Sequence, residues 1–168
     1  MAPGMEKTNK ALFDSAISIE LDAGRIYKDF ERYFSHESEI SAFWAGLSDD
    51  ESNHAEILRD TRDSIPLDIL ETEAKPAMWE NISSVSQLLE KNINAVIETL
   101  DDAYELAHQI EASEVGAIFK FLTLEFFSSP VREAFITSEI MDHQGKLVSF
   151  TKRFGPRSWR KEILAVKR

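Results

Sequence analysis

The sequence predicts an all-α protein, built as a four-helix bundle with one long crossover between the second and third long helices and a short C-terminal helix. Apolar residues recur at spacings of three and four over four long stretches, as in amphipathic helices. No stretch shows the alternation of apolar and polar residues that a half-buried strand needs. The prolines beyond residue 3 punctuate the helical stretches: Pro66, Pro76, Pro130 and Pro156.

The first two long helices are predicted on either side of a short link. Residues 6–34 carry the first apolar stripe, and the link at 35–38, Ser-His-Glu-Ser, offers helix-capping side chains. The second stripe begins at Ile40 and is expected to stop near Pro66, because the residue before a proline avoids the helical region. A short link makes these helices antiparallel neighbours.

Residues 66 to about 101 form the longest connection. Within it, a short helix is predicted to start at Ile82 and to run through Leu100, and Asp101 is the predicted N-cap of the next helix. A connection of this length lets the second and third long helices lie parallel.

The third long helix is predicted from Ala103 to Ser128 and the fourth from Pro130 to just before Gly155. Ser129 as N-cap and Pro130 in the first turn mark the start of the fourth helix. Its expected apolar positions are Val131, Phe135, Ile136, Met141, Leu147 and Phe150.

Charge divides the chain into two parts. The net charge is −11, but residues 151–168 hold seven Lys and Arg side chains against one Glu, so this segment is +6 and the rest is −17. We therefore predict one bundle domain over 1–155 and a basic C-terminal helix or tail over 156–168, most simply docked on the acidic bundle.

Composition excludes several classes of protein. With 43% apolar residues and few Gly and Pro, the 168-residue chain is neither disordered nor collagen-like. The absence of Cys excludes disulfides, thiolate zinc sites and iron–sulfur clusters. The acidic balance argues against nucleic acid, and no apolar run is long enough for a membrane span. Because the first ten residues do not resemble a signal peptide, we expect a cytoplasmic protein.

Acidic and histidine side chains interrupt the apolar stripes near the middle of all four long helices. They are Glu20 on the first, Glu51 and His54 on the second, Glu111 and Glu114 on the third, and Glu139 and His143 on the fourth. Glu51 and His54 form an E-x-x-H pair on one helix face. In a bundle with this connectivity, these polar positions on the four helices lie at the same level in the core.

Buried glutamates at this level need partners. An unpaired buried carboxylate costs several kcal/mol, against a net domain stability of about 5–15 kcal/mol. Five of them must therefore be protonated, paired or bound to cations, and the nearest basic side chain on these stripes is Lys146. Carboxylates with imidazoles, without thiolates, suit iron or manganese. The sequence thus predicts a metal site in the bundle core.

These residues resemble the ferritin-like carboxylate-bridged di-metal pattern, and more closely the bundle domain of rubrerythrin, over residues 10–150. Glu20 followed by Tyr27, the E-x-x-H at Glu51, and the Glu111-x-x-Glu114 pair carry the resemblance. It implies a ligand set for two iron ions, with manganese or a mixed pair as alternatives, and a Tyr27 hydroxyl that reaches a ligating carboxylate. It also implies peroxide reduction or iron oxidation. We further expect a homodimer.

The sequence departs from the family pattern in two places. Three residues before His143 stands Ile140, where the family has the glutamate of a second E-x-x-H. Either Glu139 ligates through a local distortion such as a π-bulge, or one bridging carboxylate is lost and the site holds one metal or none. The rubredoxin-like module, which needs Cys, is missing, so a redox role requires an external electron donor.

Two other functions stay open. The bundle is a non-catalytic binding or structural module if its site has decayed. It is a phosphotransfer domain if His54 is exposed to solvent.

Overall fold

The computed structural model describes residues 7–113 and 115–155, and this part of the chain consists of helices and their connections, without a named strand. Its helices are α1 (Asn9–Tyr33), α2 (Ser38–Asp63), α3 (Leu67–Leu70), α4 (Pro76–Asn92), α5 (Leu100–Glu111), α6 (Val115–Glu125) and α7 (Pro130–Phe154). A single isolated bridge joins Thr8 to Glu73, which fixes the start of α1 to the connection after α3.

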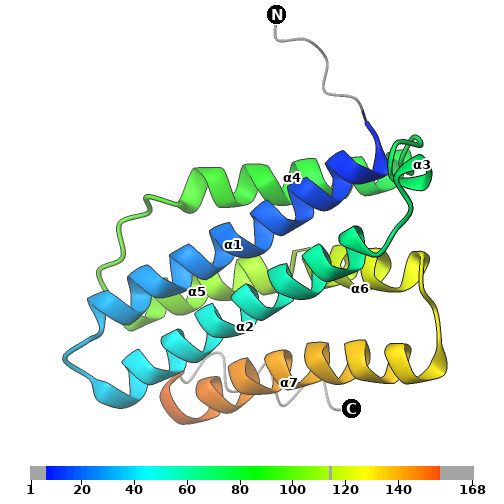
Figure 1. Cartoon of the computed structure of the whole chain (residues 1–168). Coiled ribbons are helices and arrows are strands. Elements are labelled where there is room, and N and C mark those ends of the chain that lie inside the picture. Colours follow the sequence, from blue (N-terminus) through cyan, green and yellow to red (C-terminus); the bar gives the residue numbers. More distant parts are fainter. Residues whose placement is uncertain (1–6, 114, 156–168) are drawn as a thin grey trace, which may run out of the picture.

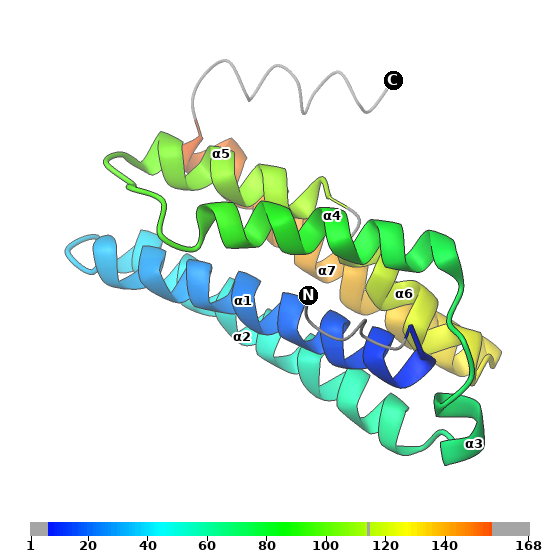
Figure 2. The ribbon, with the colours of Figure 1, turned by 90° about the horizontal axis from the view of Figure 1, so that it is seen from above.

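The helices form a bundle with one crossover, as the sequence predicts. Figure 1 shows α1 and α2 as an antiparallel pair, with α5 and α6 together running in the same direction as α2. Helix α7 returns antiparallel to α6, and α4 crosses the length of the bundle beside α1 (Figures 1 and 2). The four long rods of the bundle are therefore α1, α2, the α5–α6 pair and α7.

Helices α1 and α2 approach closely at the level of the polar cluster. A Cβ atom on Gly24 would lie 3.3 Å from Cβ of Glu51, so a larger residue here would require Glu51 to shift by a few tenths of an ångström. The buried hydroxyl of Ser48 donates a hydrogen bond of 2.9 Å to the Gly24 carbonyl. This contact fixes how far Glu51 stands from α1.

An aromatic cluster fills the bundle on one side of the polar level. Trp44 is fully buried and packs against Tyr27, Phe30 and Phe150, with ring centroids 6.0, 4.9 and 5.6 Å away. Burying such side chains supplies much of the apolar driving force, at about 25 cal/mol per Å². The cluster also holds the Tyr27 ring in place beside the polar side chains.

The crossover differs from its prediction. Its long helix, α4, begins at Pro76 rather than Ile82 and ends at Asn92 rather than Leu100. Proline suits the first turn of a helix, where its missing N–H has no intrahelical partner. Val96, expected on the apolar face, is 83% exposed because the helix has already ended.

The predicted helix caps are only partly correct. The N-cap of α2, Glu37, lies in the predicted link 35–38, but its side chain makes no capping hydrogen bond. The N-cap of α5 is Thr99 rather than Asp101, and it forms a reciprocal capping box with Asp102. By contrast, Ser129 caps α7 as predicted, accepting a hydrogen bond from the Arg132 amide.

The third predicted helix is two helices. Helix α5 ends at Glu111 and α6 begins at Val115. The Ser113 hydroxyl donates a hydrogen bond of 2.5 Å to the Ile110 carbonyl, and the Ser113 amide bonds the same carbonyl. These bonds accompany the end of α5, but Ser15 and Ser52 make comparable hydroxyl-to-carbonyl bonds inside continuous helices, so the serine alone does not end the helix.

Helix α7 buries three of its six predicted apolar positions, Ile136, Leu147 and Phe150, and exposes the other three. Val131, Phe135 and Met141 are 81%, 50% and 65% exposed. The buried face carries Ile136, His143, Leu147, Phe150 and Thr151. This face includes a histidine and a threonine, so hydropathy alone did not define it.

The first helix begins later than predicted, at Asn9 with Thr8 as its N-cap rather than at Glu6. The predicted basic segment 156–168 lies outside the described residues. Among those described, no helix is both long and apolar enough to cross a membrane.

Candidate metal centre

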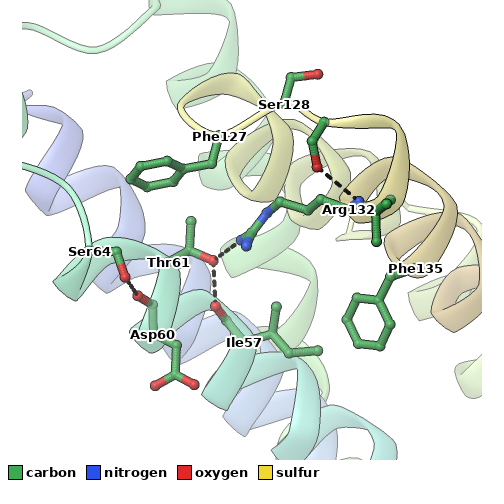
Figure 3. A pocket seen from close by; sticks show the side chains of 10 residues that line it. Ile57, Asp60, Thr61, Ser64, Phe127, Ser128, Arg132 and Phe135 are labelled. Carbon is green, nitrogen blue, oxygen red and sulfur yellow. Dashed lines mark hydrogen bonds between the residues drawn. The ribbon is translucent and has the colours of Figure 1, made fainter.

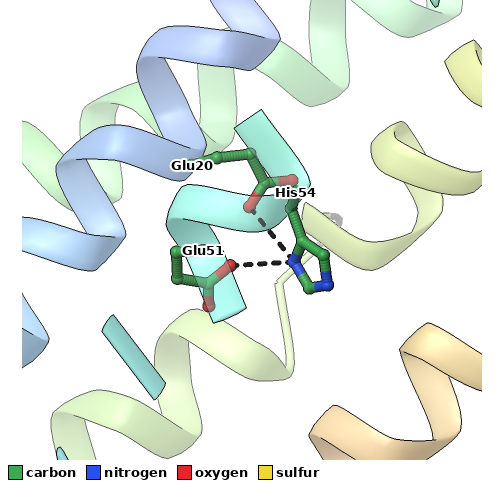
Figure 4. A group of neighbouring side chains, drawn as sticks. All are labelled: Glu20, Glu51 and His54. Carbon is green, nitrogen blue, oxygen red and sulfur yellow. Dashed lines mark hydrogen bonds and ion pairs between the residues drawn. The ribbon is translucent and has the colours of Figure 1, made fainter. Parts of the chain in front are cut away.

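Two helices bring together the first group of possible ligands. Figure 4 shows Glu20 of α1 facing Glu51 and His54 of α2. Nδ1 of His54 lies 3.1 Å from Oε2 of Glu51 and 3.9 Å from Oε2 of Glu20. The i, i+3 spacing on α2 places both of its side chains on one face, toward α1. Each of the three residues offers a ligand atom within 4.8 Å of the others.

The second group adds residues from α5 and α7 to the same glutamate. Nε2 of His143 lies 2.9 Å from Oε1 of Glu111 and 3.4 Å from Oε1 of Glu51. Ligand atoms of these three residues also lie within 4.8 Å of one another. Glu111 is the last residue of α5, so the break before α6 occurs beside the site.

Glu51 belongs to both groups and faces each with a different oxygen. The three carboxylates and two imidazoles thus form two triads that share one carboxylate, which is the arrangement of a carboxylate-bridged pair of metal sites. The buried members are only 2–7% exposed.

The side chains present fit a metal ion. Oε2 of Glu20 and Nε2 of His143 are both buried, and neither makes a hydrogen bond among the described residues. Buried polar atoms normally find partners, so each such orphan needs an explanation. A divalent cation in each triad would satisfy both atoms, and a mixed oxygen and nitrogen donor set suits iron or manganese.

The pKa values show what the cluster does without a cation. Burial raises the pKa of Glu20 well above 4.5, and the negative charges of Glu51 and Glu111 raise it further. Burial acts on Glu51 in the same direction, but the hydrogen bond from His54 and the charge of His143 outweigh it and lower the pKa of Glu51. Without a metal ion, bound protons therefore compensate part of the negative charge of the cluster.

His143 holds one of these protons. Burial lowers the pKa of His143, but its contacts with Asp50 and Glu111 and the charge of Glu51 outweigh burial and raise that pKa to about 10. A metal ion at Nε2 has to displace this proton, so metal binding and proton release are linked.

Residues around the triads fix their orientation. The Tyr27 hydroxyl donates a 2.7 Å hydrogen bond to Oε1 of Glu111, as expected for this tyrosine. Nδ1 of His143 lies 3.2 Å from Oδ2 of Asp50, and Lys146 donates to both oxygens of Asp50 at 2.6 Å. A carboxylate on one ring nitrogen sets the tautomer, which leaves Nε2 for a metal.

Asp50 was missed by the sequence reasoning. It directly precedes Glu51, and consecutive helical residues differ by about 100°, so it faces α7 while Glu51 faces the core. The available signal was its position before an E-x-x-H pair.

Glu139 lies outside both triads. Helix α7 is α-helical without a π-bulge from Pro130 to Phe154, and Glu139 accepts a 3.0 Å hydrogen bond from Asn53 of α2. Ile140 instead lines a small cavity of about 30 Å³ together with both histidines and the three clustered glutamates. Glu114 lies outside the described residues. Metal binding by Glu139 and by Glu114 stays a prediction.

His54 is only 7% exposed, which excludes the phosphotransfer alternative because an acceptor histidine must reach a partner protein. A groove of about 760 Å³ lies elsewhere, between the end of α2 and the start of α7 (Figure 3). There the Arg132 guanidinium is engaged by Thr61 and by the Thr123 carbonyl, so it offers little to an anionic ligand.

The comparisons with known proteins agree with this geometry. A family model described as "Rubrerythrin" matches residues 12–125, which span α1 to α6. The match ends before α7, the helix that carries Ile140 and His143. No curated protein and no solved structure matches the chain significantly.

Proposed function

The chain belongs to the rubrerythrin family, and we propose that it holds two iron ions in its bundle core and reduces peroxide or oxidises iron. The observation that carries this proposal is the pair of buried triads that share Glu51. Glu20, Glu51 and His54 would hold one ion, and Glu51, Glu111 and His143 the other. Manganese or a mixed pair fits the same donors.

Two iron ions in such a centre supply the pair of electrons that the reduction of a peroxide to water consumes. The protein's own side chains form and orient the two metal positions. Glu51 joins the two positions, Asp50 keeps Nε2 of His143 directed at the second, and Tyr27 holds Glu111. The aromatic cluster around Trp44 keeps one flank of the centre free of water. Electrons have to come from an external donor, because the 168 residues hold no Cys for an iron–sulfur relay.

Metal content tests the proposal directly. We expect protein purified under iron-replete conditions to contain about two iron ions per chain. Glu51→Ala removes the shared ligand and should abolish binding at both positions, whereas His54→Ala should affect mainly one. Glu56→Ala is the matched control, since Glu56 is an exposed glutamate on the same helix. Iron-free wild-type protein under these conditions would refute the centre.

Turnover is the second test. The reduced, iron-loaded protein should consume hydrogen peroxide while a chemical reductant is present, and Glu51→Ala should lose this activity. Normal turnover by Glu51→Ala would show that adventitious iron is responsible.

One observation favours the alternative, a non-catalytic module with a decayed site. Ile140 places a hydrocarbon side chain against the cavity where the family has a carboxylate. Thermal unfolding with and without Mn²⁺ separates the two functions, because a ligand that binds only the folded state raises the midpoint. An unchanged midpoint at millimolar Mn²⁺ would favour the alternative.

A further inference from the structure

An open groove adjoins the metal centre on the side of α2 and α7. Its volume is about 630 Å³, and its lining includes Asp50, Glu139, Asp142 and Lys146. The exposed Gly145 and Asp142 show that it opens to solvent. It is separate from the groove around Arg132 in Figure 3.

His54 and His143 line both this groove and the small cavity at the centre. Their rings, with centroids 5.4 Å apart, therefore stand between solvent and the buried carboxylates. The His143 side chain is only 7% exposed, and its Nε2, which makes no hydrogen bond among the described residues, lies 2.9 Å from Glu111. A cation that crosses the groove therefore meets a ligand atom, Nε2 of His143, directly behind the two histidine rings.

Glu139 lies on the groove side of the His54 and His143 rings. It lies one helical turn before His143 on α7, and Asn53, its hydrogen-bond partner, directly precedes His54 on α2. The hydrogen bond holds the carboxylate between the two helices without neutralising it, since an amide carries no charge.

The charge of the groove favours cations. Lys146 and Asp50 neutralise one another through their paired hydrogen bonds, and the carboxylates of Glu139 and Asp142 outweigh the one positive charge of the protonated His143, so the groove is net negative. The inner cavity, by contrast, borders α6 and the middle of α7 with Val115, Phe119 and Ile140, a poor surface for a hydrated ion. A cleft lined by one sign of charge raises the local concentration and association rate of the opposite ion.

We infer that divalent cations reach the centre through the α2–α7 groove, and that Glu139 is a transient contact on this route rather than a resident ligand. The inference rests on the proposed metal centre. It assigns the groove to metal uptake and gives Glu139 a kinetic role, which accounts for its position beside both triads and outside them.

The rate of Co²⁺ uptake tests this route. Apoprotein is mixed with Co²⁺ in a stopped-flow spectrometer, and the visible absorption of the bound ion is followed at low and high salt. Glu139→Gln keeps the shape and the Asn53 hydrogen bond but removes the charge. We expect a three- to tenfold slower association at low salt than in Glu133→Gln, which makes the same charge change on an exposed part of α7 outside the groove. High salt should reduce the difference.

The equilibrium affinity separates the outcomes. Slower association with an affinity within tenfold of wild type supports the route. Association equal to that of Glu133→Gln overturns it, and so does an affinity at least a hundredfold weaker or a lost equivalent of Co²⁺, which would make Glu139 a resident ligand. If wild-type protein binds no Co²⁺ or iron, the metal centre itself is refuted, and the route with it.

A steric variant provides an independent check. Gly145 lines the groove and has no atom within 4 Å of a Cβ built on it, so Gly145→Leu can fill the groove without a clash at the backbone. Gly46 on α2 has equally open surroundings and does not line the groove, so Gly46→Leu is the control. Uptake should slow at least threefold in Gly145→Leu only. Equal rates in both variants would overturn the route.

Discussion

Replacing Glu20 by glutamine should change stability in opposite directions without and with metal. Glu20 is 2% exposed, and its Oε2 has no hydrogen-bond partner among the described residues. Without metal, this carboxyl group is either charged and unpaired, or it is protonated, which its raised pKa favours. Glutamine has the same shape and no charge to bury, so the apoprotein should be more stable.

The size of the effect follows from the cost of a buried charge. Replacing buried ionic groups by neutral ones of similar volume stabilises proteins by about 1–4 kcal/mol, which for a chain of this size raises Tm by about 3 to 12 °C. The pH dependence has a definite sign. Because the pKa of Glu20 is raised in the folded state, the contribution of Glu20 to wild-type stability is largest below pH 4.5 and falls as the pH rises toward the raised pKa, by up to about 1.4 kcal/mol per pH unit. The glutamine variant should lose this decline.

With metal bound, the wild type should be more stable to unfolding than Glu20→Gln. A metal at a hundred times its Kd adds about 2.7 kcal/mol to the folded wild type, and Glu20→Gln forfeits one carboxylate ligand. The assay is urea unfolding of chelator-treated and Co²⁺-loaded protein between pH 5 and 8, with the exposed Glu56→Gln as a control that should stay within about 0.5 kcal/mol of wild type. An apoprotein variant less stable than wild type would refute the argument from burial, and equal Co²⁺ stabilisation in both proteins would refute the ligand role.

Three further outcomes are expected. Asp50→Ala leaves Nδ1 of His143 without its partner, so Co²⁺ affinity measured by chelator competition should fall about 10–100-fold; an unchanged affinity would contradict the orienting role. The pKa of His143 is raised from 6.5 to about 10, so its stabilisation of the apoprotein is complete below about pH 6.5 and is lost as the pH rises toward 10. Urea unfolding of His143→Gln should lack this decline, and calorimetry of wild type in buffers of different ionisation enthalpy should detect proton release when Co²⁺ binds. Tyr27→Phe removes the hydrogen bond to Glu111 and should lower the unfolding free energy by about 1 kcal/mol; no loss in urea unfolding would argue against that bond.

Much of the fold could be predicted from local sequence. The spacing of apolar residues places α1, α2 and α7 to within a few residues, and Ser129 with Pro130 identifies the start of α7. The predicted third helix breaks at Ser113, whereas Ser15 and Ser52 make comparable hydroxyl-to-carbonyl hydrogen bonds inside continuous helices. Whether such a residue ends a helix depends on what its surroundings stabilise, and the apolar spacing does not contain that information.

For the candidate site, the sequence by itself determined which residue types lie at the middle of each helix. Glu20, Glu51 and His54 are identified by their position on apolar stripes, since the helical period fixes which residues share a face. Only the tertiary structure decided that Glu51 serves two triads, that Asp50 faces His143, and that Glu139 stands outside both. These depend on the rotation of each helix about its axis and on its distance from its neighbours. Both are set by packing between residues far apart in sequence, such as the contact of Gly24 with Ser48.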